Sequence, residues 1–539
     1  MNHNMFSIII PTRQRHDTLK HSIQSVLNQT HTEFEVVVMD NFSSPETAEV
    51  AKSFNDSRIK YYRSPKRLSM SDNWELGLSY ATGEYVTLLG DDDALMPDGV
   101  EICSRLLHEY DVNIVTWSRE NTYWWDSAIV PWNRNRLGIN FRQVGQILNS
   151  RQKLKEYYNF QISWDLMPML YNSFVHQDII AKVKSIYGKY FLTYCPDIFS
   201  GIVNAYFSDR YFYSSRGLSL GGISGHSTGT SAWFQSFNSE PMQKFSEEFK
   251  KNVNELIHES LVPVPNLVLT ETTERILTKE LFFPEDHELK IDIITLLNCM
   301  AANINRDLGK YDVNLQAIED LAEKYQVPIS EINIPPKLVQ DPKAYQGPVF
   351  NSNGLLDLLL INCEQAGISN VAQAAMLARG ILQGLDFLTI YSLTKEQEIA
   401  LSNELKLREK NLIIFPNWSE TEELISQELT AVLKEIATHP DKDRITLLID
   451  TSNISVEDAD LVVSGVVMNL LLEQNLDISE GAEISLIGQL NENGWESLLF
   501  RISARIVLNY ENTEVIARAK AENLPLLELN SLKLQELSI

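Results

Sequence analysis

Three consecutive carboxylates, Asp91, Asp92 and Asp93, form the group with the clearest chemical potential in this sequence. They follow the apolar run Tyr85–Leu89, whose β-forming residues predict a buried strand. Adjacent carboxylates repel one another, so such a group is tolerated where it faces water or where a hard divalent cation neutralises it. The alternative is an acidic turn in which Asp93 or Asp98 only starts the following helix. The triplet is therefore a candidate cation site at the carboxyl end of a strand, where open α/β sheets usually bind their ligands.

A fourth carboxylate, Asp197, follows Pro196 and opens an apolar helical pattern that continues to Tyr206. At a helix N-terminus, the helix dipole and the free backbone amides favour the ionised carboxylate. Such a group is suited to take a proton from an attacking hydroxyl. The alternative is a simple helix cap.

Polar residues also follow the two predicted strands Phe6–Ile10 and Phe34–Met39. Thr12 and Arg13 come after the first strand, and Asp40 comes directly after the second. Nucleotide-binding α/β folds place an acidic residue that contacts the base or ribose at the position of Asp40. An Asx turn that closes the loop is the alternative for this residue.

Two basic residues, Lys66 and Arg67, precede a predicted helix over Asn73–Ala81, for which Ser71 or Asp72 is the expected cap. The pair is suited to face a diphosphate, or it is a solvated loop pair. A glycine-rich phosphate loop of either common kind is missing at the start of the chain.

Composition excludes several classes of protein. At 539 residues, the chain is too long for one core. The net charge of -26 argues against a nucleic-acid partner. No apolar run reaches the roughly 18 residues that span a bilayer, and the N-terminus lacks the features of a signal peptide, which together predict a cytoplasmic protein. The four cysteines lie far apart, so the sequence predicts neither a disulfide framework nor a zinc motif.

Strands and helices alternate up to about residue 236, which predicts a parallel α/β sheet with right-handed crossovers. Helical patterns follow, including Lys244–His258, Thr273–Phe283, His287–Arg306 and Asn314–Tyr325, and a proline-rich linker comes after them. A second alternation begins near Gly354, with predicted strands at 385–390, 411–415, 445–449 and 482–487. The predicted domains are therefore residues 1–236, a helical extension and linker over 237–340, and a Rossmann-like α/β domain over 341–539.

Five motifs in the N-terminal region occur in a recognisable order and spacing. They are Ile10-Pro11-Thr12-Arg13, Val38-Met39-Asp40-Asn41, Asp72-Asn73-Trp74, Ala81-Thr82-Gly83-Glu84-Tyr85, and Gly90-Asp91-Asp92-Asp93 followed by Met96-Pro97-Asp98. Over about the first 110 positions, this pattern resembles the family-2 glycosyltransferases. In its alternation of strands and helices, the C-terminal domain is similar to the nucleotide-binding lobe of a GT-B glycosyltransferase, by fold analogy alone.

The resemblance implies a GT-A fold for residues 1–236, a nucleotide-diphosphate sugar donor such as a UDP-sugar, Mn²⁺ or Mg²⁺, and inversion at the anomeric carbon. It implies that Thr12 lies at the nucleotide, Asp40 at the base and Asp91 at the ribose or sugar. The implied set of sugar-donor residues is Pro11, Thr12, Arg13, Asp40, Arg67, Asp72, Asn73 and Asp91. Asp197 matches the position of the acceptor base, and the implied metal residues are Asp92, Asp93 and His226. A common form of the family has an aspartate at the position of Gly90, so the resemblance leaves open whether Asp92 binds the ion alone or together with Asp93.

These observations predict an inverting, metal-dependent glycosyltransferase that modifies a carbohydrate or glycolipid acceptor in surface polysaccharide or glycoconjugate synthesis. Peripheral contact with the inner face of the membrane is compatible with this prediction. A sugar-phosphate nucleotidyltransferase is the alternative enzyme, disfavoured because the usual glycine-rich, lysine-containing start is replaced by Pro11-Thr12-Arg13. A non-catalytic sugar-binding or scaffold protein on a transferase fold is the alternative outside enzymes.

Overall fold

The computed structural model describes residues 5–226, 247, 256–264, 266–306, 308–338, 347–382, 389–390, 392–478 and 481–529. The chain divides into two compact units, Met1–Ile390 and Tyr391–Ile539. The predicted helix over Lys244–His258 lies largely outside the described residues.

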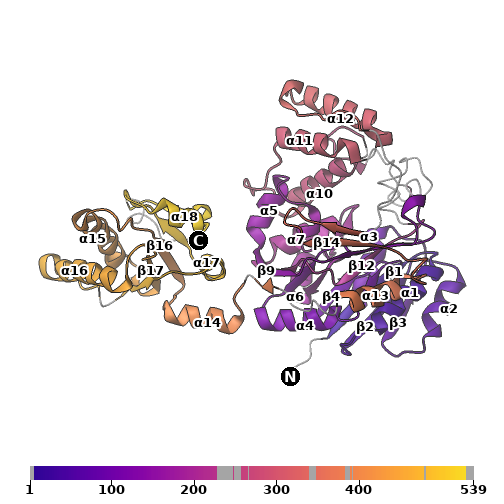
Figure 1. Ribbon diagram of the computed structural model, residues 1–539, viewed down its shortest axis with the longest axis horizontal. Coiled ribbons are helices and arrows are strands. Elements are labelled where there is room, and N and C mark those ends of the chain that lie inside the picture. The colour runs from indigo at the N-terminus through magenta and orange to yellow at the C-terminus, as the bar shows by residue number, and fades with distance from the viewer. Residues whose placement is uncertain are drawn as a thin grey trace. The chain divides into compact units, whose positions relative to one another are not determined.

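The first unit is built on a mixed sheet whose strands lie in the order β15-β9-β11-β6-β10-β4-β1-β2-β3 among the described residues. Figure 1 labels β1, β2, β3, β4 and β9 of this sheet. The strands are β1 (Phe6–Thr12), β2 (Phe34–Asp40), β3 (Ile59–Arg63), β4 (Tyr85–Leu88), β6 (Ile114–Trp117), β9 (Val144–Asn149), β10 (Ser173–His176), β11 (Arg210–Ser214) and β15 (Thr389–Ile390). β1 pairs in parallel with β2 and β4, and β2 pairs in parallel with β3. The carboxyl ends of these four strands therefore meet at one edge, as the sequence predicted.

The central strands are buried on both faces, which explains their continuous apolar runs. Ile8, Ile9 and Ile10 in β1 are fully buried, as are Val36 to Val38 in β2. The helices between them are α1 (His16–Leu27), α2 (Pro45–Ser53), α3 (Met70–Ser79) and α4 (Gly99–Tyr110). In α1, Leu19, Ile23 and Val26 recur at helical spacing and are fully buried.

A second sheet in this unit has the strand order β13-β14-β8-β7-β12-β5 among the described residues. Its strands are β5 (Ala94–Leu95), β7 (Thr122–Trp124), β8 (Arg136–Asn140), β12 (Ser219–Ile223), β13 (Gly347–Phe350) and β14 (Leu356–Asn362). β14 pairs antiparallel with β8, and α13 (Val371–Leu382) packs against α1, β5 and β12. Thus β13, β14 and α13 complete the first unit.

This arrangement differs from the predicted domain boundary at 340/341, because the contacts place the division between Ile390 and Tyr391. The predicted strand at 385–390 is described only at Thr389 and Ile390, which form β15 beside β9 in the first unit. The physical reason is that β7 pairs with only one edge of β8. The hydrogen-bonding groups of the other edge pair with β14, which comes from a later segment of the chain. A strand signal in the sequence does not say which sheet the strand will join.

The predicted helical segment is present as α10 (Leu267–Phe282), α11 (Ile293–Asn303) and α12 (Tyr311–Lys324) (Figure 1). α11 and α12 share an apolar cluster with the start of α10. The other end of α10 packs against α7 (Pro196–Tyr206) of the sheet domain. The helical segment is therefore attached to the helix that carries Asp197.

The second unit is a parallel five-stranded sheet in the order β18-β17-β16-β19-β20 among the described residues. The strands are β16 (Lys410–Ile414), β17 (Ile445–Asp450), β18 (Glu483–Ile487), β19 (Ala504–Ile506) and β20 (Leu526–Leu527). The helices are α14 (Lys395–Glu404), α15 (Glu422–Thr438), α16 (Val456–Gln474), α17 (Glu492–Leu499) and α18 (Thr513–Arg518). The predicted Rossmann-like alternation is confirmed.

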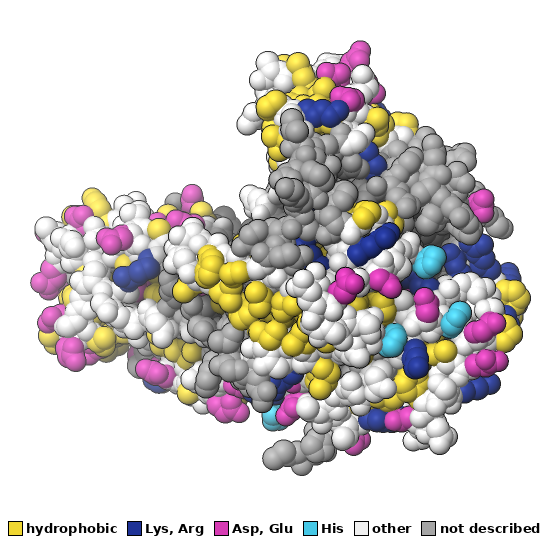
Figure 2. All heavy atoms as spheres, turned by 45° about the vertical axis from the view of Figure 1, so that its right-hand side comes forward, with side chains coloured by type: hydrophobic (Ala, Val, Ile, Leu, Met, Phe, Trp, Pro, Cys, Tyr) yellow, Lys and Arg dark blue, Asp and Glu magenta, His cyan; other side chains and the backbone are white. Residues whose placement is uncertain are grey.

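Within the described part of the chain, no helix combines the length and the apolar character needed to cross a bilayer. On the side shown in Figure 2, Lys and Arg side chains are interspersed with Asp and Glu among the described residues.

Candidate active site

Thr12, Asp91 and Arg15 form a hydrogen-bonded group at the carboxyl edge of the first sheet. The Thr12 hydroxyl donates to Asp91 Oδ2 at 2.8 Å, and Arg15 Nη1 donates to Asp91 Oδ1 at 2.8 Å. Arg15 Nη1 also lies 3.7 Å from Asp92 Oδ2. Burial alone would lower the pKa of Arg15, but the charges of Asp91 and Asp92 outweigh it and raise that pKa. Arg15 is therefore a fixed positive charge beside two of the three carboxylates.

The carboxylate of Asp93 accepts hydrogen bonds from other residues of the protein. Its Oδ2 accepts a hydrogen bond from the Tyr171 hydroxyl at 2.5 Å and another from the Gly90 amide at 3.2 Å. Its Oδ1 accepts a hydrogen bond from the Gly222 amide at 2.6 Å. Both oxygens are thus occupied by the fold, which leaves little capacity for a metal ion.

Asp92 is the carboxylate of the triplet that fits a cation best. It is 5% exposed, and its Oδ2 accepts the Ser224 hydroxyl at 2.6 Å. Burial and the charges of Asp93 and Asp91 raise its pKa to about 7, although the charge of Arg15 opposes this shift. A cation beside such a carboxylate favours its ionised form.

The predicted metal set of Asp92, Asp93 and His226 does not come together as a three-ligand cluster. In the described ranges, no group of three or more His, Cys, Asp and Glu side chains has a metal-binding arrangement. The backbone carbonyl of His226 accepts a hydrogen bond from Arg15 Nη2, so this residue does reach the edge of the site. A divalent ion that takes one or two carboxylates, with substrate phosphates and water as its other ligands, needs no such cluster. Asp92 fits that kind of ion.

Gly222 lets β12 lie close against one side of this site. A Cβ atom at Gly222 would lie 1.6 Å from the carbonyl oxygen of Asp92. Only glycine therefore lets β12 approach the triplet closely enough for its amide to bind Asp93. The same Asp92 carbonyl also accepts the Trp125 indole N–H at 3.1 Å.

Asp40 lies fully buried at the end of β2. Its Oδ1 accepts the Ser43 amide, three residues later in the chain, at 2.8 Å. The carboxylate thus closes the loop after β2 through a hydrogen bond that spans one residue more than an Asx turn. Its Oδ2 accepts the Tyr61 hydroxyl at 2.5 Å and lies 3.7 Å from Arg63 Nε. Asp40 therefore shapes the loop at the carboxyl end of β2.

The remaining predicted sugar-donor residues lie in different surroundings. Asn73 is buried beneath the β2 edge, and its amide donates to the Met39 carbonyl at 3.4 Å. Asp72 pairs with Lys189 at 3.0 Å. Pro11 and Arg13 are partly exposed, and Arg67 is exposed.

Asp197 lies in the first turn of α7, as the sequence predicted. Its Oδ1 accepts the Ile198 amide at 2.9 Å. The same turn is tied to the sheet, because Ser200 Oγ donates to the Asp197 carbonyl at 2.6 Å and accepts the Leu170 amide at 3.0 Å. Leu170 precedes Tyr171, which binds Asp93, so hydrogen bonds link the α7 N-terminus to the triplet.

Glu274 of α10 is a neighbour of Asp197 that the sequence did not predict. It is 1% exposed, and its Oε1 accepts the amide of Cys195, the residue that caps α7. Burial, together with the charge of Asp197, raises the pKa of Glu274 to about 8, although hydrogen bonds from Thr193 and the Cys195 amide oppose this shift. Burial likewise raises the pKa of Glu271, one turn earlier in α10, to about 7. The helical segment thus supplies buried carboxyl groups beside the candidate base.

Sequence reasoning also missed Arg15, Tyr171 and Ser224. Arg15 stands two positions after Arg13, and nothing in the spacing separates their roles. Tyr171 and Ser224 reach the triplet from positions 78 and 132 residues away along the chain. No local signal could have identified these two residues.

Comparison with known proteins matches the N-terminal region to one family. Residues 7–165 match the model of Glycosyl transferase family 2. This match confirms the predicted family resemblance and the predicted GT-A domain at the N-terminus.

The relatives share only part of their length with this chain. A Campylobacter jejuni protein named GalNAc(5)-diNAcBac-PP-undecaprenol beta-1,3-glucosyltransferase is 38% identical over 106 residues, which are 19% of this chain and 34% of that protein. An Escherichia coli protein named UDP-Glc:alpha-D-GlcNAc-diphosphoundecaprenol beta-1,3-glucosyltransferase is 32% identical over 115 residues, 21% of this chain and 46% of that protein. A crystal structure of S. aureus TarS 1-349 in complex with UDP-GlcNAc aligns with 61% of this chain and 89% of its own, at 15% identity and a TM-score of 0.35. The chain therefore spans less than half the length of these two curated relatives.

Proposed function

We propose that the N-terminal domain transfers a sugar, with inversion, from a UDP-sugar to a hydroxyl group of a carbohydrate or glycolipid acceptor. The observation that carries this proposal is the group of Thr12, Arg15, Asp91 and Asp92 at one sheet edge, inside the region that matches the family model. Ligands of open α/β sheets bind at this edge. The C-terminal unit has no assigned step in this reaction.

Each residue at this sheet edge would contact a different part of the sugar donor. Asp40 would contact the base, and Asp91, held by Thr12 and Arg15, would contact the ribose or sugar. Asp92 would hold Mn²⁺ or Mg²⁺ against the diphosphate. When bound, such an ion neutralises the negative charge that develops on the leaving diphosphate. Arg15 carries a permanent positive charge next to the same position and would add to this neutralisation.

Asp197 would act as the base. Inversion requires the acceptor hydroxyl to attack the anomeric carbon on the side opposite the diphosphate and to lose its proton as it does so. The dipole of a helix favours negative charge at its N-terminus, and a carboxylate there is placed to accept that proton. Ser200 Oγ accepts the Leu170 amide and donates to the Asp197 carbonyl, and these two hydrogen bonds would hold this turn in place relative to the aspartate triplet.

The acceptor class follows from the relatives. The names of both bacterial relatives specify undecaprenol-linked glycans as acceptors. We infer an acceptor of the same class, a glycan on a lipid carrier, for this protein. Such an acceptor would bring the protein to the inner face of the membrane as a peripheral partner.

Asp92→Asn tests the metal site and the function together. Calorimetry with UDP and MnCl₂ is expected to show binding to the wild-type protein that falls at least tenfold in Asp92→Asn, about 1.4 kcal/mol. Asp178→Asn is the matched control, because the Asp178 side chain is 81% exposed and lies on α6 (Gln177–Tyr187). Unchanged metal-dependent binding in Asp92→Asn would refute the assignment.

Product analysis separates the alternatives. A glycosyltransferase releases UDP from UDP-glucose or UDP-GlcNAc in the presence of Mn²⁺, and EDTA stops the release. A nucleotidyltransferase instead forms pyrophosphate from UTP and a sugar 1-phosphate. A sugar-binding scaffold yields neither product.

A further inference from the structure

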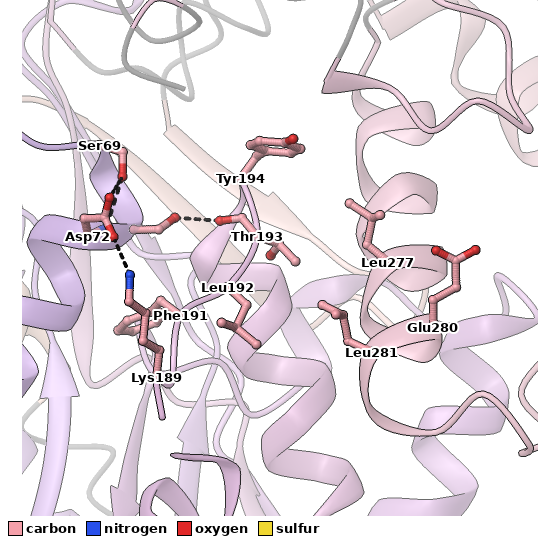
Figure 3. A pocket seen from close by; sticks show the side chains of 11 residues that line it. Ser69, Asp72, Lys189, Phe191, Leu192, Thr193, Tyr194, Leu277, Glu280 and Leu281 are labelled. Atoms are coloured by element: carbon pink, nitrogen blue, oxygen red, sulfur yellow. Dashed lines mark hydrogen bonds and ion pairs between the residues drawn. The ribbon is translucent and has the colours of Figure 1, made fainter. Parts of the chain in front are cut away.

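A pocket of about 510 Å³ lies between the N-terminal turn of α3, the segment Lys189–Tyr194 and α10 (Figure 3). Its volume is within the range of small-molecule sites, roughly 300–1,000 Å³. Of the predicted sugar-donor residues, Asp72 lines it. The lining does not include Asp91, Asp92 or Asp93, so the pocket is separate from the aspartate triplet that would hold the diphosphate.

One wall of the pocket is polar. Asp72 accepts a hydrogen bond from Ser69 Oγ at 2.9 Å and pairs with Lys189 Nζ at 3.0 Å. The Asp72 and Lys189 side chains are 50% and 53% exposed, so each keeps hydrogen-bonding capacity toward the open space. An arrangement of this kind is suited to the hydroxyl groups of a sugar.

The opposite wall is formed by leucine side chains together with Glu280 of α10. Figure 3 shows Leu277 and Leu281 projecting from α10 toward Leu192. Tyr194 adds an aromatic ring at the end of the same segment. A ligand that fills this pocket thus meets apolar side chains along one side and ionic groups along the other, as an amphiphile would.

Thr193, a lining residue that is 5% exposed, is held by hydrogen bonds to its neighbours. Its hydroxyl is hydrogen-bonded to the Glu274 carboxyl, and its backbone carbonyl accepts the Ser71 hydroxyl at 2.6 Å. These contacts fix the position of the segment that forms this part of the pocket wall.

The pocket lies next to elements that position the candidate base, because α10, which lines it, packs against α7, and Asp197 is in the first turn of α7. We propose that this pocket binds the acceptor as an amphiphilic glycoside, with the sugar against Asp72 and Lys189 and the apolar aglycone against Leu192, Leu277 and Leu281. This inference rests on the proposed function and specifies where its acceptor lies.

The test measures binding of octyl and methyl N-acetylglucosaminide to the full-length protein by saturation-transfer NMR and calorimetry. The octyl glycoside is expected to bind at least tenfold more tightly than the methyl glycoside, because only its chain reaches the leucine side chains. Leu277→Trp fills the pocket and should weaken octyl glycoside binding at least tenfold. Ile294→Trp on α11 is the matched control, since Ile294 is 41% exposed and outside the pocket.

A second variant guards against misfolding of Leu277→Trp. Lys189→Ala removes an exposed side chain and should weaken binding several-fold, whereas Lys182→Ala on α6, also exposed, should not. The proposal is overturned if the wild-type protein binds neither glycoside, if the two glycosides bind equally, or if both pocket variants bind like their controls.

The calorimetric titration with UDP and MnCl₂ distinguishes failure of this inference from failure of the proposed function. Leu277→Trp should retain UDP binding, so its loss of glycoside binding would be local to the pocket. If the wild-type protein binds the octyl glycoside through this pocket but neither binds UDP nor releases it from a UDP-sugar, the transferase proposal fails. The pocket would then be a glycoside-binding site, and its assignment as the acceptor site would be overturned.

Discussion

Shortening the chain at two places tests where the first unit ends. We expect a chain that ends at Ile390 to fold, because it contains all the described partners of both sheets in this unit. We expect a chain that ends at Gln340 to be severely destabilised, because it lacks β13, β14, α13 and β15.

The expected loss in free energy of unfolding follows from the apolar side chains that these elements bury. In α13, Val371 is 0% exposed and Leu382 is 1% exposed, and both belong to an apolar cluster with Tyr123, Trp125 and Leu137. Full burial of two such side chains contributes roughly 3–6 kcal/mol. That is comparable with the 5–15 kcal/mol by which typical domains are stable. Loss of β14 also leaves the edge of β8 without its partner from Leu358 to Asn362.

Thermal unfolding followed by circular dichroism measures the difference. The chain ending at Gln340 should melt roughly 10 °C or more below the chain ending at Ile390, or should be recovered only as aggregate. The chain ending at Ile390 is the control, since it lacks the second unit in the same way. Cooperative melting of both chains within a few degrees would refute the boundary proposed here.

Two substitutions near α7 test the proposed base and its surroundings. Asp197→Asn should bind UDP and Mn²⁺ normally but lower the rate of sugar transfer by roughly 10²–10⁴; near-normal transfer by a slightly less stable protein would identify Asp197 as a helix cap. Glu274→Gln should remove part of the dependence of stability on pH between about 4.5 and 8, as measured by urea unfolding at several pH values. Over that window, the native state holds a proton on Glu274 that the unfolded chain has released, so the free energy of unfolding falls as pH rises. Equal slopes in both proteins would contradict this assignment, since Glu271 contributes the same background to each.

The local pattern of the sequence was sufficient for the order of elements in both α/β parts. Alternating apolar strands and amphipathic helices have distinct periods, and each is read within a short window. The ends of strands are local features too, which is why the positions of Asp40 and Asp91 to Asp93 at one sheet edge were predictable. The position of Asp197 in the first turn of α7 was predictable for the same reason.

The roles within the aspartate triplet needed the tertiary structure. Asp91, Asp92 and Asp93 are identical in the sequence, but their partners come from distant segments. Thr12 lies 79 positions from Asp91, and Gly222 lies 129 positions from Asp93. These contacts commit Asp93 to the fold and leave Asp92 as the carboxylate best suited to a cation.

The sequence by itself determined which secondary structures form and which residues end the strands, because backbone propensity and apolar periodicity act over a few neighbouring residues. Only the tertiary structure decided that β14 and α13 complete the first unit, that Arg15 pairs with Asp91, and that Glu274 supports the cap of α7. Those choices depend on which distant surfaces are complementary once the elements have formed. Complementarity of that kind is a property of the assembled surfaces and has no signature in a local window of sequence.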